Sequence, residues 1–165
     1  MSGTEILRTD NVVVLRGKTH LLSLEIHKQS LLDSMETLAL GAMRAAENAL
    51  PRRSNLQVGA AVLAGSDDTL FCGANFEVRW QGSYHAEELA ILNALYAGRW
   101  EVRAICVSAE RELFTPCGRC MDLIKEFGGR HCIIAHYRPS TKGLSIFTSE
   151  EVMPFYPATD GNNGG

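Results

Sequence analysis

The sequence lacks any apolar run of about 20 residues, the length that a membrane-spanning helix requires. Its N-terminus also lacks the basic and then apolar pattern that marks a secretory signal. There is no excess of basic residues, because 16 Lys and Arg against 19 Asp and Glu give a formal net charge of −3. This balance disfavours a protein that binds nucleic-acid phosphates. We therefore expect no membrane partner and no nucleic-acid partner.

Cysteine is scarce and odd in number, with five in 165 residues. An odd count without a secretory signal argues against a disulfide framework and favours buried thiols or metal ligands in the reducing cytoplasm. Cys72, Cys106 and Cys132 lie in apolar runs typical of buried strands. The other two lie three residues apart and call for a different explanation.

The composition, 45% hydrophobic and 21% charged, is that of a globular protein, and the length fits one domain. No internal repeat or linker divides the chain. We expect residues 1–26 to form an N-terminal extension, either a hairpin or an arm. Residues 27–157 are expected to form the domain, and residues 158–165 a flexible tail.

Apolar residues at spacings of three and four predict an amphipathic helix from about residue 28 to Leu50, ended by Pro51. Two apolar runs, 58–63 and 70–74, flank turn-forming residues and predict a β-hairpin. The polar segment 75–84 is predicted to be a loop. The remaining elements expected are helices over 85–97 and 117–127 and strands over 102–109, 132–136 and 144–147. This alternation is typical of a layered α/β domain.

Three candidate zinc ligands stand at the predicted helix starts: His85, Cys117 and Cys120. Two cysteines three apart at a helix start lie on adjacent turns, so that both sulfurs can reach one ion. The partial positive charge of the helix N-terminus should also lower the pKa of these thiols. Three protein ligands with an open fourth position are the pattern of a catalytic zinc site.

Glu87 follows His85 by two residues, and in the first turn of a helix both side chains can lean over the helix end. A carboxylate near the ion, but not bound to it, is placed to carry a proton. The alternative is a structural zinc site with a fourth ligand from His131, Cys132 or His136. Glu87 has no task in such a site, which favours the catalytic interpretation.

The motifs at 85–87 and 116–120, His-x-Glu followed by Pro-Cys-x-x-Cys, match the zinc deaminase signature. Together with segments 54–61 and 75–77, they make residues 31–157 resemble the cytidine deaminase family, in its short-subunit branch. The resemblance implies a three-layer α/β/α sandwich on a mixed five-stranded sheet. It also implies one zinc ion per chain and a homotetramer with its sites at subunit boundaries.

The resemblance further implies how a substrate is held, and the donor and acceptor groups of an amide and a carboxylate suit sugar hydroxyls. The implied contacts are Asn75 and Glu77 to the ribose, the Ala86 N–H to the pyrimidine carbonyl, the Thr115 carbonyl to the leaving amine, Leu56 on the base, and Phe155 closing a neighbouring subunit's pocket.

Three departures from this family bear on the substrate. Short-subunit members usually have Cys in place of His85, Arg in place of Glu88, and an aromatic residue in place of Leu56. The pentapeptide at 116–120 is also found in deaminases of the antibiotic blasticidin S.

We predict zinc-dependent hydrolytic deamination of a cytosine nucleoside, cytidine or deoxycytidine, to the uracil nucleoside with release of ammonia, with Glu87 as the catalytic residue. This activity would place a cytoplasmic hydrolase in pyrimidine salvage. The alternatives are deamination of a modified cytosine nucleoside such as blasticidin S and, less favoured by the net charge, editing of a nucleic-acid base.

Overall fold

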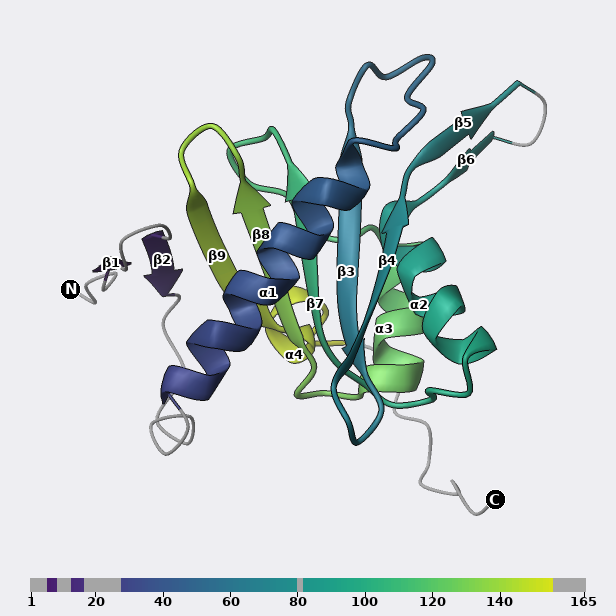
Figure 1. The fold of residues 1–165 in the computed structure, drawn as a ribbon. Coiled ribbons are helices and arrows are strands. Elements are labelled where there is room, and N and C mark those ends of the chain that lie inside the picture. The colour runs from purple at the N-terminus through teal and green to yellow at the C-terminus, as the bar shows by residue number, and fades with distance from the viewer. Residues whose placement is uncertain (1–5, 9–12, 17–27, 80–81, 156–165) are drawn as a thin grey trace.

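The computed structural model describes residues 6–8, 13–16, 28–79 and 82–155. Its centre is a mixed sheet in which five strands lie in the order β9-β8-β7-β3-β4 (Figure 1). Strands β7 and β8 are parallel, and the other neighbours among these five are antiparallel. The predicted hairpin and the predicted mixed five-stranded sheet are confirmed. The strands are β3 (Val58–Ala64), β4 (Thr69–Ala74), β7 (Val102–Ala109), β8 (Ile133–Arg138) and β9 (Gly143–Thr148).

Helices cover both faces of this sheet, as predicted (Figure 1). Helix α1 (Lys28–Ala46) packs on one face, whereas α2 (Ala86–Tyr96) and α3 (Gly118–Gly128) pack on the other. Side chains alternate along β7, because Ile105 and Val107 join the core under α2 and α3 while Cys106 joins the core under α1. The result is a three-layer α/β/α sandwich. A short helix, α4 (Ser149–Val152), follows β9.

Two short strands extend the sheet to seven. Strand β1 (Ile6–Arg8) pairs antiparallel with β2 (Val13–Arg16), and β2 pairs in parallel with β9. The rest of the N-terminal extension expected over residues 1–26 lies outside the described residues. The tail expected over 158–165 also lies outside them.

Helix α1 ends at Ala46, so the predicted end at Leu50 is wrong. Leu50 forms an isolated parallel bridge with Phe76, its N–H donates to the Asn75 carbonyl at 2.9 Å, and its carbonyl accepts from the Glu77 N–H at 3.1 Å. These hydrogen bonds to a distant segment replace the last helical turn. Apolar periodicity alone does not reveal them, because the partner lies 26 residues further along the chain.

The predicted loop over 75–84 is also wrong, because it contains a two-stranded ribbon. Strands β5 (Phe76–Val78) and β6 (Gly82–Tyr84) pair antiparallel and project beyond the main sheet (Figure 1). Gly82 has a φ of +83°, a conformation that favours glycine. Glu77 lies opposite Ser83 in this ribbon.

Two strand glycines let helices approach the sheet closely. A Cβ atom at Gly59 would lie 2.0 Å from the Ala42 carbonyl oxygen of α1. A Cβ atom at Gly73 would lie 2.5 Å from the Ala86 carbonyl oxygen and the Ala90 nitrogen of α2. Each contact places helix backbone directly on strand backbone, so neither position accepts a side chain without a shift.

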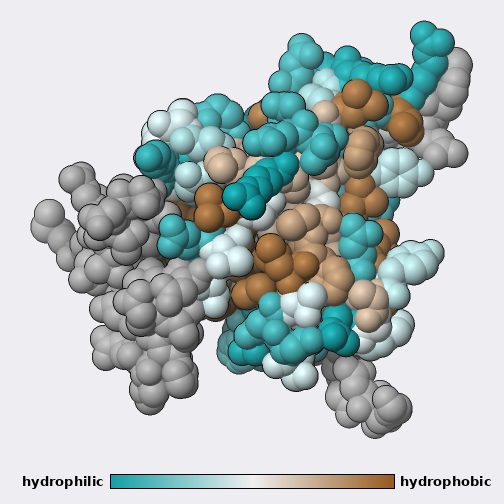
Figure 2. All heavy atoms as spheres, in the orientation of Figure 1, coloured by the Kyte–Doolittle hydropathy of each residue, from teal (hydrophilic) through white to brown (hydrophobic). Residues whose placement is uncertain are grey.

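The surface on the α1 side is not uniformly polar. Figure 2 shows apolar side chains gathered beside α1 over β3 and β4, and polar ones over the loops above them. Leu40 of α1 is 42% exposed, and Leu70 and Cys72 of β4 are only partly buried. Among the helices of the described residues, none has the length and apolar character needed to cross a membrane.

Candidate active site and metal centre

Three metal-ligating side chains meet where α2 and α3 begin. His85 immediately precedes α2, Cys117 immediately precedes α3, and Cys120 lies in the first turn of α3. The His85 Nδ1 lies 3.2 Å from the Cys117 Sγ and 3.4 Å from the Cys120 Sγ, and the two sulfurs are 3.8 Å apart. In the part of the chain that the structure describes, these three residues form the one group with metal-ligand spacing.

The spacing of these three atoms fits a tetrahedral zinc ion. Zinc binds cysteine sulfur at about 2.3 Å and imidazole nitrogen at about 2.0–2.1 Å. Tetrahedral angles then separate two sulfurs by about 3.8 Å and a sulfur from a nitrogen by about 3.6 Å. The measured separations follow this pattern, with the sulfur pair the widest. The three donors occupy three corners and leave the fourth open.

Extended backbone before each helix brings the ligands together. His85 has φ −85° and ψ 149°, and Cys117 has φ −71° and ψ 169°. A residue in this conformation just before a helix turns its side chain over the first turn. Cys120, three residues after Cys117, lies on the same side of α3 one turn later. Because both helices start at the same end of the sheet, their first turns present all three ligands to one point.

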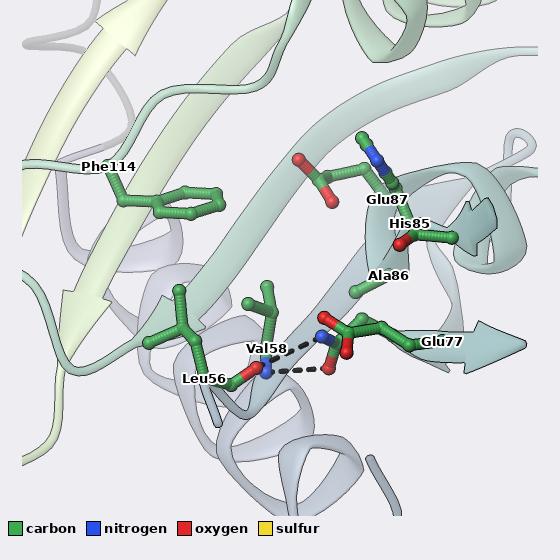
Figure 3. A pocket seen from close by; sticks show the side chains of 9 residues that line it. Leu56, Val58, Glu77, His85, Ala86, Glu87 and Phe114 are labelled. Carbon is green, nitrogen blue, oxygen red and sulfur yellow. Dashed lines mark hydrogen bonds between the residues drawn. The ribbon is translucent and has the colours of Figure 1, made fainter. Parts of the chain in front are cut away.

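Glu87 lies in the first turn of α2 and is only 2% exposed. Its carboxylate points into the pocket beside His85 (Figure 3). Burial raises the pKa of the Glu87 carboxyl, although the nearby His85 and Cys120 act in the opposite direction. A raised pKa makes a carboxylate a better proton acceptor, which suits a group that must take up a proton and return it.

The expectation that the helix N-terminus lowers the pKa of the thiols is wrong for Cys120. Burial raises the pKa of this thiol, and the negative charges of Glu87 and Cys117 raise it further. The helix dipole is outweighed because the sulfur is removed from water. A thiolate at this position therefore requires a cation beside it, which agrees with a role as a metal ligand.

The residues considered as a fourth ligand lie elsewhere. His136 is buried, and its Nε2 lies 3.1 Å from the Ala109 carbonyl oxygen. Cys132 is buried against Gly128, and His131 is exposed. Within the described residues, none of the three joins the metal-ligating group. The geometry therefore favours a site with three protein ligands over a closed structural site.

A cavity of about 160 Å³ opens beside this group. Its volume is close to that of an engineered cavity of about 150 Å³ that holds a benzene molecule, so the enclosed part suits one six-membered ring. The cavity is walled by both polar and apolar side chains (Figure 3). Its lining residues are Leu56, Val58, Asn75, Glu77, Ser83, His85, Ala86, Glu87 and Phe114.

Asn75 and Glu77 reach the pocket while also holding segment 53–58. The Asn75 Oδ1 accepts from the Val58 N–H at 2.9 Å, and its Nδ2 donates to the Leu56 carbonyl at 3.0 Å. The Glu77 carboxylate accepts from the N–H groups of Arg53 and Ser54. Hydrogen bonds from the Ser54 side chain and these N–H groups lower the pKa of Glu77, so it is ionised at neutral pH. Each side chain therefore has both a structural partner and a place in the pocket wall.

The remaining predicted contacts divide into two groups. Leu56 and Ala86 line the pocket. Thr115 and Phe155 are not among the residues that line it, and Phe155 is 95% exposed.

Sequence reasoning missed three pocket residues, Val58, Ser83 and Phe114, and expected Val58 only as the start of a strand. Ser83 was hidden because segment 75–84 was predicted to be a loop, whereas β5 and β6 place it opposite Glu77. Phe114 had a signal in the sequence, since it lies three residues before Cys117, but such closeness along the chain does not show which way a ring points.

Glu88 points to a different partner from Glu87. Its carboxylate forms an ion pair with Arg119 of α3, the residue directly before Cys120. The Arg119 side chain is 57% exposed and the Glu88 side chain 12%. The pair links the first turns of α2 and α3 beside the three ligands. An arginine is therefore present near the metal group even though Glu88 stands where the resembling family usually has one.

The fold and the site together define a class. A mixed sheet whose flanking helices bring His-x-Glu and Cys-x-x-Cys to one point is the arrangement of the zinc-dependent deaminases. Residues 33–136 match the family described as the cytidine and deoxycytidylate deaminase zinc-binding region. The chain belongs to this family, which confirms the resemblance predicted from the motifs. Family and ligand geometry agree on zinc as the cofactor.

Individual relatives agree with this assignment. The chain is 34% identical over 105 residues to a cytidine deaminase of Mycobacterium tuberculosis, covering 62% of this chain and 78% of that protein. It is 31% identical over 123 residues to a cytidine deaminase of Shewanella amazonensis, of which it spans 40%, while 71% of this chain is covered. The chain thus spans less than half the length of the Shewanella relative.

Solved structures give the same fold. The crystal structure of cytidine deaminase from Burkholderia pseudomallei superposes with a TM-score of 0.67 at 27% identity, over 74% of this chain and 98% of that one. That of Mycobacterium tuberculosis superposes with a TM-score of 0.64 at 24% identity, over 75% and 97%, and supports the fold.

Proposed function

We propose that this protein catalyses the hydrolytic deamination of a cytosine nucleoside to the uracil nucleoside, releasing ammonia. The observation that supports this most strongly is the group of His85, Cys117 and Cys120 beside the buried Glu87. Of these residues, His85 and Glu87 line a ring-sized cavity. In the proposed reaction water adds its oxygen to C4 of the pyrimidine, and the bond from C4 to the amino nitrogen breaks.

Four side chains of the site have a task in this reaction. His85, Cys117 and Cys120 hold zinc, which when bound supplies a Lewis acid that lowers the pKa of water in the open fourth position. Glu87 takes one proton from the attacking water and passes it to ring nitrogen N3. It then carries the second proton of that water to the departing amine, which leaves as ammonia.

Backbone groups orient the base in this proposal. The Ala86 N–H donates to the pyrimidine carbonyl, and its position at the start of α2, where N–H groups lack helical partners, supports that role. The Thr115 carbonyl accepts from the leaving amine. This group lies two residues before Cys117, so the segment that positions a ligand would also position the acceptor.

The polar wall of the pocket supports a nucleoside over a nucleotide. Asn75 and Glu77 offer an amide and a carboxylate to sugar hydroxyls, which need both a donor and an acceptor. No Lys or Arg is among the described residues that line the cavity, whereas Glu77 and Glu87 are. A 5′-phosphate would find like charge and no cation there. We therefore propose cytidine or deoxycytidine as the substrate.

We also propose a homotetramer in the cytoplasm. The apolar surface beside α1, with Leu40 exposed, supports burial against another subunit. Phe155 is a candidate to close a neighbour's pocket, because it is almost fully exposed on the single chain. The five cysteines are all free thiols, which supports a reducing compartment.

The direct test is turnover by the zinc-loaded protein of cytosine, cytidine, deoxycytidine, deoxycytidine 5′-monophosphate and blasticidin S. Loss of the cytosine absorbance band and release of ammonia report the reaction. We expect cytidine and deoxycytidine to be converted, and the monophosphate and free base to react far more slowly. Conversion of blasticidin S alone would replace the proposed substrate, and no conversion of any compound would overturn the activity.

A further inference from the structure

Phe114 is a pocket residue to which the proposed chemistry gives no task. Among the described residues that line the cavity, it carries the only phenyl ring, and the other ring, that of His85, belongs to the metal-ligating group. It comes from the segment that joins β7 to α3, immediately before Thr115. In Figure 3 its ring lies on the side of Leu56 and Val58, across the cavity from His85 and Glu87.

The ring is supported from behind by a buried histidine. The centroids of the Phe114 and His136 rings are 6.1 Å apart and the rings are tilted by 39°. His136 is fixed in turn, because it is 2% exposed and its Nε2 lies 3.1 Å from the Ala109 carbonyl oxygen. Phe114 itself is half-buried against the core under α2 and α3. A supported ring of this kind offers a preformed flat surface.

The other walls of the cavity do not offer one. Leu56, Val58 and Ala86 are aliphatic, and the remaining lining residues are polar. A planar pyrimidine gains most from an aromatic face, because stacking on an aromatic side chain stabilises any base through its π-system. A ring that enters the cavity with one edge toward Glu87 therefore has one aromatic partner available.

We propose that Phe114 is a specificity-determining residue that packs on the face of the pyrimidine and holds its reacting edge toward Glu87. The inference rests on the proposed function and names a residue that selects a planar base. Its contact is made equally with the substrate and the transition state, so its loss raises KM and leaves kcat nearly unchanged.

The experiment compares Phe114→Leu with Phe127→Leu in the zinc-loaded protein. Phe127 packs on the same core but lies at the far end of α3 from Cys117, and it does not line the cavity. We expect Phe114→Leu to raise KM for cytidine by about 5- to 20-fold with kcat within about two-fold, and Phe127→Leu to leave both within about two-fold. Phe114→Met serves as a second variant without a ring if the leucine variant unfolds at a lower temperature.

A binding measurement separates stacking from a purely structural role. Calorimetry with uridine, which is planar, and 5,6-dihydrouridine, which is not, requires no turnover. We expect the parent protein to favour uridine and Phe114→Leu to reduce that preference at least about three-fold. An unchanged preference, or a change equal to that of Phe127→Leu, would overturn the inference while the parent still deaminates cytidine. A parent that neither deaminates cytidine nor binds uridine would instead overturn the proposed function.

Discussion

The two faces of the sheet are packed in the same way but serve different ends. On one face Gly59 lies against the backbone of α1, and on the other Gly73 lies against the backbone of α2. Both contacts let a helix approach closely. Only the contact at Gly73 positions residues of the candidate active site, because the turn of α2 that Gly73 touches follows His85 and contains Glu87. Helix packing thus secures stability on the α1 face and also sets site geometry on the other.

Replacing Glu87 by Gln should abolish most of the catalytic activity without disturbing the packing of α2 on the sheet. Glu87 carries a proton and is not among the three ligands. We expect turnover of cytidine to fall by at least about 100-fold, with zinc content and melting temperature close to those of the parent. Metal analysis, circular dichroism and initial rates are the measurements. A variant that keeps near-full activity would remove Glu87 from the mechanism.

The matched pair Gly73→Ala and Gly59→Ala tests the comparison itself. A Cβ atom at either position meets helix backbone, so we expect each variant to lose about 1–3 kcal/mol of unfolding free energy in urea. Gly73→Ala should also lower kcat/KM for cytidine by about 10- to 100-fold, because it displaces the turn that bears Glu87. Gly59→Ala should stay within about two-fold of the parent. Equal activity losses in both would show that the two faces are not distinct in function.

Lowering the pH should reduce the stability of the folded protein through His136, the buried histidine among the described residues. Burial lowers the pKa of His136, with Arg138 acting in the same direction and the Ala109 carbonyl and Glu110 opposing it. The unfolded chain then binds this proton more readily than the folded protein. Stability from neutral His136 is complete above about pH 6.5 and is lost as pH falls below it, by at most about 1.4 kcal/mol per pH unit.

Urea unfolding between pH 8 and 5 measures this dependence, and His136→Gln is the comparison. We expect the variant to be less stable at pH 8 but to lose less free energy of unfolding on acidification. Parallel pH profiles for the two proteins would show that His136 does not carry the effect.

The smallest effect is expected at Arg119. In its ion pair with Glu88 the Arg119 side chain is exposed to water, so Arg119→Gln should leave the midpoint of urea unfolding almost unchanged. That small change should shrink further at high salt. A loss of stability as large as that of Gly73→Ala would mean that the link between α2 and α3 is a principal support of the site.

The ligand set and Glu87 could be predicted from the sequence because their chemistry is local. A helix start fixes where His85, Cys117 and Cys120 point relative to their own helix, and few other residue sets suit zinc. The strands of the main sheet were predictable for a similar reason, since their apolar runs are bounded by turn residues. That the first turns of α2 and α3 meet at one point could not be predicted locally, because it depends on the whole fold.

The errors arose where distant segments decide the outcome. Leu50 leaves the helical pattern because it pairs with Phe76, and Ser83 reaches the pocket because β6 pairs with β5. The pKa of Cys120 depends on burial that the helix start alone does not reveal. Phe114 and Leu56 are 58 residues apart in sequence yet share one cavity. No periodicity or motif spacing in the sequence indicates any of these contacts.

The pairing of β2 with β9 has a consequence for solubility. Without it, the six-residue strand β9 would end the sheet and expose a row of unpaired N–H and C=O groups. With β2 and then β1 in place, the sheet ends on a strand of three residues. An edge strand this short has few backbone groups with which a strand of a second chain could pair, which protects this side of the molecule from edge-to-edge aggregation.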